Sequence, residues 1–428
     1  MSLAAPHIDR ATLAPAPGQD SAQDTYAKLT VAAAIFFITL EIAYLAVAGV
    51  PTTLAPWVDA TNFVLGRDFL NMWMGARAVL HGDPAAWFDL NAYNAALRDM
   101  LGQQYPEHFW SYPPHLLLFI WPLGLLPYLP AYLVWCVVGI ALYLFACAGA
   151  DFGKLGGNSG AMTRGRLLFL AAAPGVAVCI FFGQNGFYTA ALLVGGLLCR
   201  ERRPILAGVL FGILTIKPQL GLLLPVMLLL ERRWLTIATA VITATLLIAI
   251  TALVFGANIW IEFWDKVIPQ QQWLTAHGDG LLFAMVPSVF YGGRMLHLPA
   301  SVDWTLQGIV SALAFAATIW TFWKRRDPAL SLSFLITATF LFTPYSLNYD
   351  MVVFGFVVAL LRERPDNSKQ DHWLLIVVWT LPVTMMIAAA GHVPLAPIVL
   401  IAFACRLLWR LRYGSVTAVT LLAEQAIA

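Results

Sequence analysis

Asp68 is the acidic residue best placed for chemistry in this sequence. It belongs to the segment Leu-Gly-Arg-Asp-Phe at 65–69, inside a polar loop of about sixty residues, roughly 50–111, that interrupts a strongly apolar chain. Apolar residues then recur at helical spacing until Gly82, which predicts a helix over about 69–81 lying against a membrane. A carboxylate at that boundary could act as the base of an enzyme with a lipid-linked substrate. Alternatively, Asp68 caps the helix, which would lower its pKa and make it a weaker base.

A lysine and a polar turn form a second set of candidates. The turn Phe-Gly-Gln-Asn-Gly at 182–186 joins two apolar runs. Because Asn-Gly is a strong turn signal, Asn185 is better explained by the turn, and Gln184 is the better candidate for a ligand contact. Lys217 ends another apolar run immediately before Pro218. It could hold a lipid phosphate, or it could be a lysine that extends from the membrane to its surface.

Further candidates lie in segments expected on the same side of the membrane. Tyr112 and His115 flank two prolines that keep the chain extended, and both could donate hydrogen bonds to a hydroxyl or a phosphate. Alternatively, this segment has only a structural role, as the rigid end of the loop before the apolar run. Asn348 and Tyr349, followed by an aspartate, open a later apolar run and could line the same cavity. Arg294 is a further cation expected on that side.

The composition places these residues in a membrane protein. The 428 residues are 60% hydrophobic and 11% charged, and a water-soluble domain of this length could not cover so much apolar surface. Nineteen of the 25 basic residues lie in the N-terminal segment, in short gaps between apolar runs or near the C-terminus, and they mark one side as cytoplasmic by the positive-inside rule. The net charge of +2 gives no reason to expect a nucleic-acid partner.

The apolar runs predict an all-α integral membrane bundle of about twelve transmembrane helices with both termini inside. We expect a disordered cytoplasmic tail at 1–26, a membrane domain at 27–412 and a second tail at 413–428. The membrane domain includes two outer loops, at 50–111 and 256–303. The predicted spans are 27–49, 131–149, 167–182, 187–199, 204–216, 218–230, 234–254, 304–323, 329–343, 349–361, 372–390 and 394–411.

Two apolar segments do not fit this count as full spans. If the basic gaps are cytoplasmic, the runs 115–128 and 281–298 must begin and end outside. Backbone of that kind is tolerated at membrane depth only beside protein or a watery cavity, so both segments predict an outer cavity with juxtamembrane helices. Nine tryptophans fall on this side, where they either form an interfacial belt or stack on a sugar or lipid. The five cysteines have no spacing that suggests a disulfide framework or a metal site.

Taken together, these motifs resemble glycosyltransferase family 87, the polyprenyl-phosphate-mannose-dependent membrane mannosyltransferases of the GT-C superfamily. The resemblance runs from about Ala27 to Arg412. It depends on the order and spacing of several short motifs. These are the Asp68 loop with Leu80-His81-Gly82, Tyr112-Pro113-Pro114 followed by Pro122-Leu123 and Leu126-Pro127, Gly183-Gln184-Asn185, Gly212 through Lys217-Pro218, and Pro344-Tyr345-Ser346.

The resemblance implies a role for two of the candidates. The family's carboxylate in the first outer loop, its proposed catalytic base, corresponds to Asp68, and its lysine-proline pair corresponds to Lys217 and Pro218. Many relatives carry Trp and His after the Pro-x-Ser turn. This chain has Leu-Asn-Tyr-Asp at 347–350 instead, so no role is carried over there.

The expected activity is an inverting transfer of mannose or a similar sugar from a polyprenyl-phosphate donor to a lipid or glycan acceptor. It would take place on the outer side of a bacterial-type inner membrane and would need neither metal nor nucleotide cofactor. Asp68 would be the catalytic base, and the other candidates would bind substrate. The alternative is a transporter or flippase for a lipid-linked sugar, but no internal repeat or matched pair of interrupted spans is apparent.

Overall fold

The structure is a computed structural model that describes residues 25–33, 35, 36, 39, 43, 63–150, 162–278, 280–324 and 326–427, with side chains as far as Tyr413. Every regular element of more than one residue in these ranges is helical. Most of the first predicted span, 27–49, and most of the predicted N-terminal tail lie outside the described residues.

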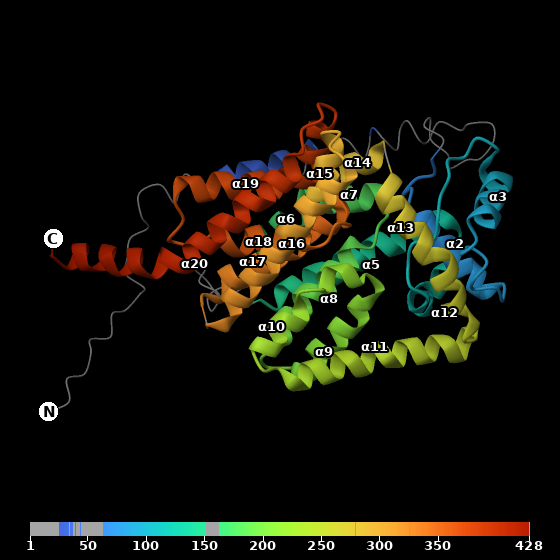
Figure 1. Ribbon diagram of the computed structural model, residues 1–428, viewed down its shortest axis with the longest axis horizontal. Helices are drawn as coiled ribbons and strands as arrows, with labels where there is room; N and C mark the ends of the chain where they lie inside the picture. The colour runs from blue at the N-terminus through green and yellow to red at the C-terminus, as the bar shows by residue number, and fades with distance from the viewer. Residues whose placement is uncertain are drawn as a thin grey trace.

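Four helices are long and apolar enough to cross a membrane, or five if the bent pair of α6 and α7 counts as one span. The four are α5 (Tyr128–Ala148), α11 (Trp234–Phe255), α16 (Ala300–Trp323) and α19 (Lys369–Ala389). α6 (Arg164–Ala171) and α7 (Pro174–Phe182) meet at an angle of 47°. The last helix, α20 (Leu395–Ile427), projects from one end of the molecule (Figure 1). The predicted total of about twelve spans is therefore not confirmed.

Other predicted spans form shorter helices joined in hairpins. In the first hairpin, α7 turns at 183–185 into α8 (Gly186–Cys199). The second runs from α9 (Pro204–Ile213) and η4 (Leu214–Ile216) to η5 (Pro218–Gly221) and α10 (Leu224–Leu230). The third runs from α17 (Pro328–Phe342) to η7 (Asn348–Val352) and α18 (Val353–Leu361). Proline at the first helical position starts α7, α9, η5 and α17, where its missing N–H has no intrahelical partner to lose.

The length of these arms explains why the span count differs. The shorter apolar helices have 10–17 residues. At 1.5 Å per residue they extend about 15–25 Å, less than the ~30 Å of a bilayer's hydrocarbon core. A hydropathy pattern counts each apolar run as a crossing, whereas these helices are individually shorter than the hydrocarbon core is thick.

The ends of the hairpins opposite their tips are joined by ion pairs. Arg200 Nε donates to Glu231 Oε2 at 2.9 Å, which links the loop before α9 to the loop after α10. Arg166 at the start of α6 pairs with Glu363 after α18. Because these basic loops lie together at one end of the arms, the three tips at 183–185, 217 and 343–350 meet at the other end.

Short helices lie beyond the tips, and several of them gather at one end of the molecule (Figure 1). The predicted helix 69–81 is confirmed as α2, and the runs 115–128 and 281–298 form short segments rather than long helices. These elements are α2 (Phe69–Leu80), α3 (Leu90–Leu101), η2 (Pro114–Leu116), α4 (Leu117–Ile120), η3 (Trp121–Leu125), α12 (Asn258–Glu262), the π-helix η6 (Phe263–Val267), α13 (Ile268–His277), α14 (Leu281–Met285) and α15 (Val289–Met295).

Candidate active site

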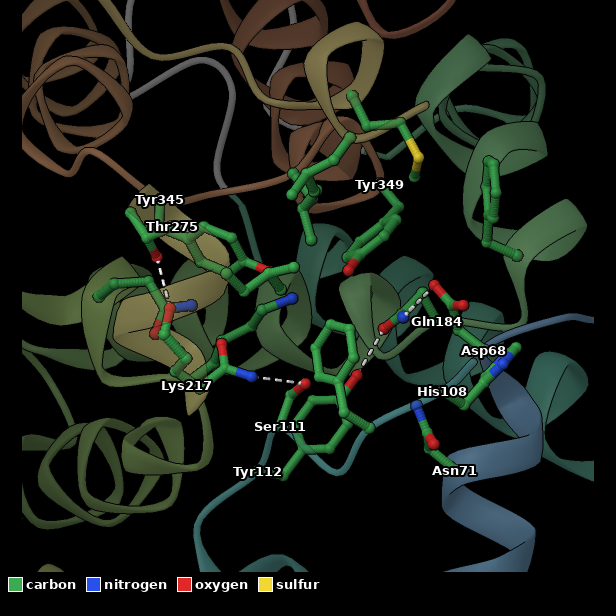
Figure 2. Close-up of a pocket in the computed structure, with 18 of the residues that line it drawn as sticks. Asp68, Asn71, His108, Ser111, Tyr112, Gln184, Lys217, Thr275, Tyr345 and Tyr349 are labelled. Atoms are coloured by element: carbon green, nitrogen blue, oxygen red, sulfur yellow. Dashed lines mark hydrogen bonds between the residues drawn. The ribbon is translucent and has the colours of Figure 1, made fainter. Parts of the chain in front are cut away.

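A cavity of about 740 Å³ lies where the hairpin tips meet the short helices. Its lining brings together Asp68, Tyr112, Gln184, Lys217 and Tyr349, which are far apart in the sequence. Figure 2 shows how these side chains surround the space. The rest of the lining includes both polar and apolar residues. The polar part includes Arg67, Asn71, Glu107, His108, Ser111, Gln219, Gln271, Gln272, Thr275, Thr343 and Tyr345.

Asp68 is held by a strained turn that packs on the first hairpin tip. Gly66 and Arg67 have φ angles of 75° and 32°, in the left-handed region that is unfavourable for arginine. The amide of Asp68 donates to the carbonyl of Phe182 at 3.0 Å. This close approach requires a glycine at 183, where a Cβ would overlap the Gly66 carbonyl.

The carboxylate of Asp68 does not cap α2. Asp68 occupies the N-cap position, but its side chain accepts no capping hydrogen bond. Instead Oδ2 accepts a hydrogen bond from Gln184 Nε2 at 2.7 Å, and the half-buried carboxylate lines the cavity. The alternative explanation of Asp68 as a helix cap is therefore wrong, because the helix begins without using this side chain.

The environment of Asp68 makes it a stronger base than an ordinary aspartate. Burial raises its pKa, and this effect outweighs the opposing influence of His108, of the Gln184 hydrogen bond and of the charges on Arg67 and Lys217. A carboxylate with a raised pKa holds an abstracted proton more readily at neutral pH.

Gln184 is oriented by a second hydrogen bond. The Tyr112 hydroxyl donates to Gln184 Oε1 at 2.8 Å, which leaves the amide NH₂ facing Asp68 (Figure 2). The close hydrogen-bond partner of Asp68 is thus a neutral amide. A neutral donor orients the carboxylate while lowering its basicity less than a direct ion pair would.

Lys217 joins the tips of all three hairpins. Its Nζ donates to Asp350 Oδ1 at 2.5 Å and to Asn185 Oδ1 at 3.2 Å, and it lies 4.7 Å from the centre of the Tyr349 ring. The backbone of η7 can reach this position because residue 186 is glycine, where a Cβ would overlap the Tyr349 carbonyl. Lys217 lines the cavity as expected, but Asp350 neutralises its charge, which the sequence analysis did not anticipate.

Comparison with known proteins agrees with this geometry. The profile of glycosyltransferase family 87 matches residues 110–344, more than half of the chain. The protein belongs to glycosyltransferase family 87. The matched range contains Tyr112, Gln184 and Lys217, while Asp68 precedes it and Asp350 follows it. No curated protein and no solved structure gives a significant match.

Four predicted site residues of this glycosyltransferase are not among those that line the cavity. Asn185 is fully buried behind Lys217, and Asn348 donates to the Pro382 carbonyl at 2.9 Å. His115 stacks on Trp260, and burial lowers its pKa to about 4, so the ring is neutral at pH 7. Arg294 lines a second, smaller cavity and cannot contact a group held by Asp68 without rearrangement.

The structure also adds two basic side chains that the sequence analysis did not select. Arg67 lines the cavity and lies over the rings of Phe63 and Phe181, at 4.5 and 5.0 Å. His108 lines it close to Asp68 (Figure 2). Arg67 could have been selected from the sequence, because it is a positively charged residue directly before the candidate base. Nothing local marked His108, whose position depends on hydrogen bonds between its backbone and Asn94.

Proposed function

We propose that this glycosyltransferase moves mannose or a similar sugar from a polyprenyl-phosphate donor to a lipid or glycan acceptor on the outer side of the membrane. The observation that carries the proposal is the position of Asp68. Its carboxylate has a raised pKa, is oriented by a neutral amide, and lines a cavity large enough for a sugar and an acceptor hydroxyl.

The reaction is a single displacement at the anomeric carbon. The acceptor oxygen attacks that carbon from the face opposite the phosphate, and the bond between the carbon and the phosphate oxygen breaks. Asp68 takes the acceptor's hydroxyl proton as the new bond forms. The electron pair of the broken bond leaves with the polyprenyl phosphate, and the configuration at the anomeric carbon inverts.

The leaving phosphate needs positive charge or strong donors as it gains charge. Arg67 and Lys217 are both cations that line the cavity and could take this role, although Asp350 already balances the charge of Lys217. Lys217 then contributes a remaining N–H rather than a full charge, and the Tyr112 hydroxyl is already donated to Gln184. Arg294, the further cation expected on this side, lines the second cavity instead.

The apolar part of the cavity suits the prenyl chain of the donor. Its section outside the hairpin tips is formed by residues from η6, α13, α14 and the start of α16, and further apolar residues line the cavity at the hairpin tips. Trp304 belongs to this section, whereas Trp264 and Trp273 on the same short helices are 68% and 60% exposed, as an interfacial belt requires. The apolar side chains of this section are Phe263, Ile268, Leu274, Leu282, Met285 and Trp304.

The distribution of charge supports an outer location for the cavity. The arginine-rich loops lie at the ends of the hairpins away from the tips, and the positive-inside rule assigns such loops to the cytoplasm. The cavity at the tips then opens toward the opposite side.

A transfer assay tests the proposal. Purified protein, a radiolabelled polyprenyl-phosphate sugar and an acceptor lipid extract are expected to give a labelled glycoside, and a nucleotide sugar is expected to give none. Transfer from the nucleotide sugar alone would overturn the donor assignment. Movement of label across a vesicle membrane without a new glycosidic bond would favour a flippase.

A further inference from the structure

A second cavity of about 440 Å³ lies between α14, α15 and the end of α19. Its walls are mainly apolar, and its rim carries Arg294, His297 and His392. No acidic residue is among the residues that line it. The apolar wall consists of Phe283, Ala284, Met295, Met386, Ala389 and Ala390.

The Arg294 side chain is held in place yet has unused donor capacity. Its guanidinium lies over the rings of Phe283 and Tyr291, at 5.1 and 5.7 Å. Nη1 is buried and has no hydrogen-bond partner among the residues that the structure describes. A buried N–H of a cation without a partner is costly, so this atom is suited to an anionic oxygen.

Two histidines face each other beside Arg294. The rings of His297 and His392 have centroids 5.7 Å apart, and the two residues have φ angles of 56° and 54°. A left-handed backbone is unfavourable for a residue with a side chain, and such strain collects at ligand-binding positions. Here it brings imidazoles from the turns after α15 and after α19 to the same cavity.

The nearest acidic group does not fill the role of an anionic ligand. Asp303, in the first turn of α16, is attracted electrostatically by Arg294, yet neither of its oxygens has a hydrogen-bond partner within the described residues. Its carboxylate packs against Gly293, where a Cβ would overlap Oδ1. Asp303 is not among the residues that line this cavity, so Arg294 is the side chain through which the cavity presents a charge.

Helix α14 separates this cavity from the active site. Leu282 and Met285 line the first cavity, while Phe283 and Ala284 line the second. A helix of five residues is thus the partition between the two spaces.

We propose that the second cavity binds the phosphate group of an anionic lipid, with Arg294 as the main contact and the lipid chain against the apolar wall. The phosphate could belong to a membrane phospholipid or to a polyprenyl phosphate, and both share the chemistry that this rim recognises. The site is distinct from the one that holds Asp68, so the proposal does not depend on the identity of the sugar donor.

Native mass spectrometry of the purified protein tests this. The probes are phosphatidylglycerol, a polyprenyl monophosphate, phosphatidylcholine and inorganic phosphate, each added to wild type and to Arg294→Gln. Arg77→Gln is the matched control, because Arg77 also lies over an aromatic ring, that of Trp73 at 4.8 Å, beside His81, and lines neither cavity. A His297→Ala/His392→Ala variant tests the rim without removing the arginine.

We expect Arg294→Gln to weaken binding of an anionic lipid by about tenfold or more, the loss typical of a charge-assisted hydrogen bond, while Arg77→Gln binds as wild type does. A difference between wild type and Arg294→Gln with phosphatidylglycerol identifies a phospholipid site, and one with the polyprenyl phosphate alone identifies the carrier. Equal binding by Arg294→Gln and wild type overturns the proposal. So does equal loss with phosphatidylcholine, or a response to inorganic phosphate alone. Glycosyl transfer, measured separately, reports on the proposed function whatever the lipid result.

Discussion

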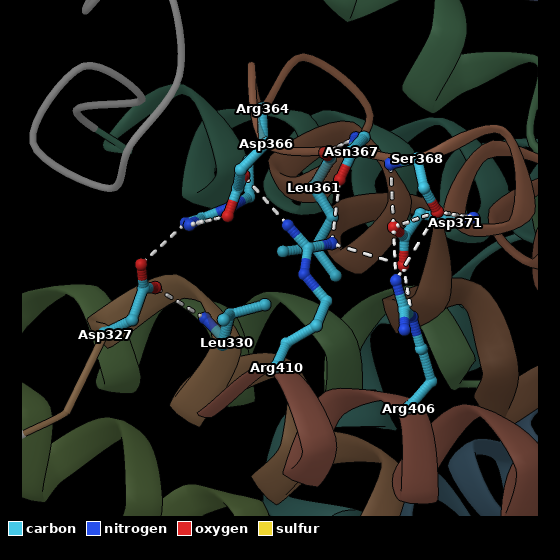
Figure 3. A network of polar contacts seen from close by, with 10 residues as sticks. All are labelled: Asp327, Leu330, Leu361, Arg364, Asp366, Asn367, Ser368, Asp371, Arg406 and Arg410. Atoms are coloured by element: carbon cyan, nitrogen blue, oxygen red, sulfur yellow. Dashed lines mark hydrogen bonds and ion pairs between the residues drawn. The ribbon is translucent and has the colours of Figure 1, made fainter. Parts of the chain in front are cut away.

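Two regions of this glycosyltransferase use the same charged residue types in opposite ways. At the start of α17, in the loop between α18 and α19, and within α20, arginines and aspartates form a closed network in which Arg364 contacts Asp327 at 2.8 Å and Asp366 at 2.9 Å (Figure 3). Arg410 contacts the same Asp366 at 2.8 Å. In the cavity, Asp68 has a neutral amide as its close partner. The charges of the network join helices, whereas, among the described residues, the carboxylate of Asp68 in the cavity has no arginine or lysine as a direct hydrogen-bond donor and can face a substrate.

The pKa values of Asp366 and Asp68 differ in the same sense. Burial opposes the charged form of both. At Asp366, the hydrogen bonds and charges of Arg364 and Arg410 overcome burial, and its pKa is lower than usual. At Asp68, burial prevails and the pKa is raised. The carboxylate that accepts hydrogen bonds from two arginines is structural, whereas the one whose hydrogen-bond donor is a neutral amide is a candidate base.

Replacing Asp68 should have the largest effect on activity. Asp68→Asn keeps the shape of the side chain and its contact with Gln184 but cannot accept a proton, so we expect transfer to fall by about 10²–10⁴-fold. Because a carboxylate with a raised folded-state pKa is destabilising when ionised, the same variant should unfold at an equal or higher temperature. Rates with a radiolabelled donor and a thermal unfolding curve measure both. Full activity in Asp68→Asn would show that another group acts as the base.

Breaking the Lys217–Asp350 pair should instead reduce stability. Asp350→Asn leaves a buried ammonium without its counter-charge, which typically costs about 3–5 kcal/mol. We expect a lower unfolding temperature and less folded protein after extraction from the membrane. Lys217→Met/Asp350→Asn should recover part of that stability, since no unpaired charge remains. Normal stability in Asp350→Asn would mean that the pair does not hold the hairpin tips together.

The elements of the cavity were more predictable than its contacts. Helical spacing gave α2, because that spacing is a local pattern, and the runs 115–128 and 281–298 form short segments, as expected of runs that do not cross. The meeting of Gln184, Lys217 and Asp350 depends on how three hairpin tips pack, which no local pattern records. The span count was less reliable for a related reason, since hydropathy does not distinguish a crossing from an arm that ends at a turn.

Individual site residues show the same limit. Asp68 was identified because it stands alone beside an amphipathic helix. Asn348 was selected because it opens an apolar run on the outer side, yet its side chain donates to Pro382 instead, and Arg294 was selected by its charge but lines the second cavity. Charge and sequence position indicate a side of the membrane, whereas the choice between two cavities a short helix apart is made by tertiary packing.

Gln184 should tune the pH dependence of transfer. Its hydrogen bond favours the ionised form of Asp68, so Gln184→Leu should raise the carboxyl pKa further. The base must be ionised to act, and activity is lost as the pH falls through this pKa. We therefore expect the acid limb of the pH–rate profile to move to higher pH by about one unit, the equivalent of one hydrogen bond to a charged group.

Tyr112→Phe is the control for this shift. It removes the hydrogen bond to Gln184 Oε1 but keeps the amide next to Asp68, so the acid limb should move less than in Gln184→Leu. An acid limb that stays in place in Gln184→Leu would separate Asp68 from the ionisation that controls the rate.

The closed network should give the smallest response. Arg406 makes two hydrogen bonds to Asp371, at 2.8 and 2.9 Å, but it is 26% exposed, and Arg410 lies 3.6 Å from the same carboxylate. Because solvent screens the pair and a second arginine remains, Arg406→Gln should cost only about 0.5–1 kcal/mol. Transfer per folded molecule should equal that of wild type, since Arg406 does not line the active-site cavity. Unfolding curves and rates on the same preparation measure both effects. A large loss of transfer with little loss of stability would mean that the network affects the cavity. Charged residues that hold helices together could then no longer be separated from those that take part in the reaction.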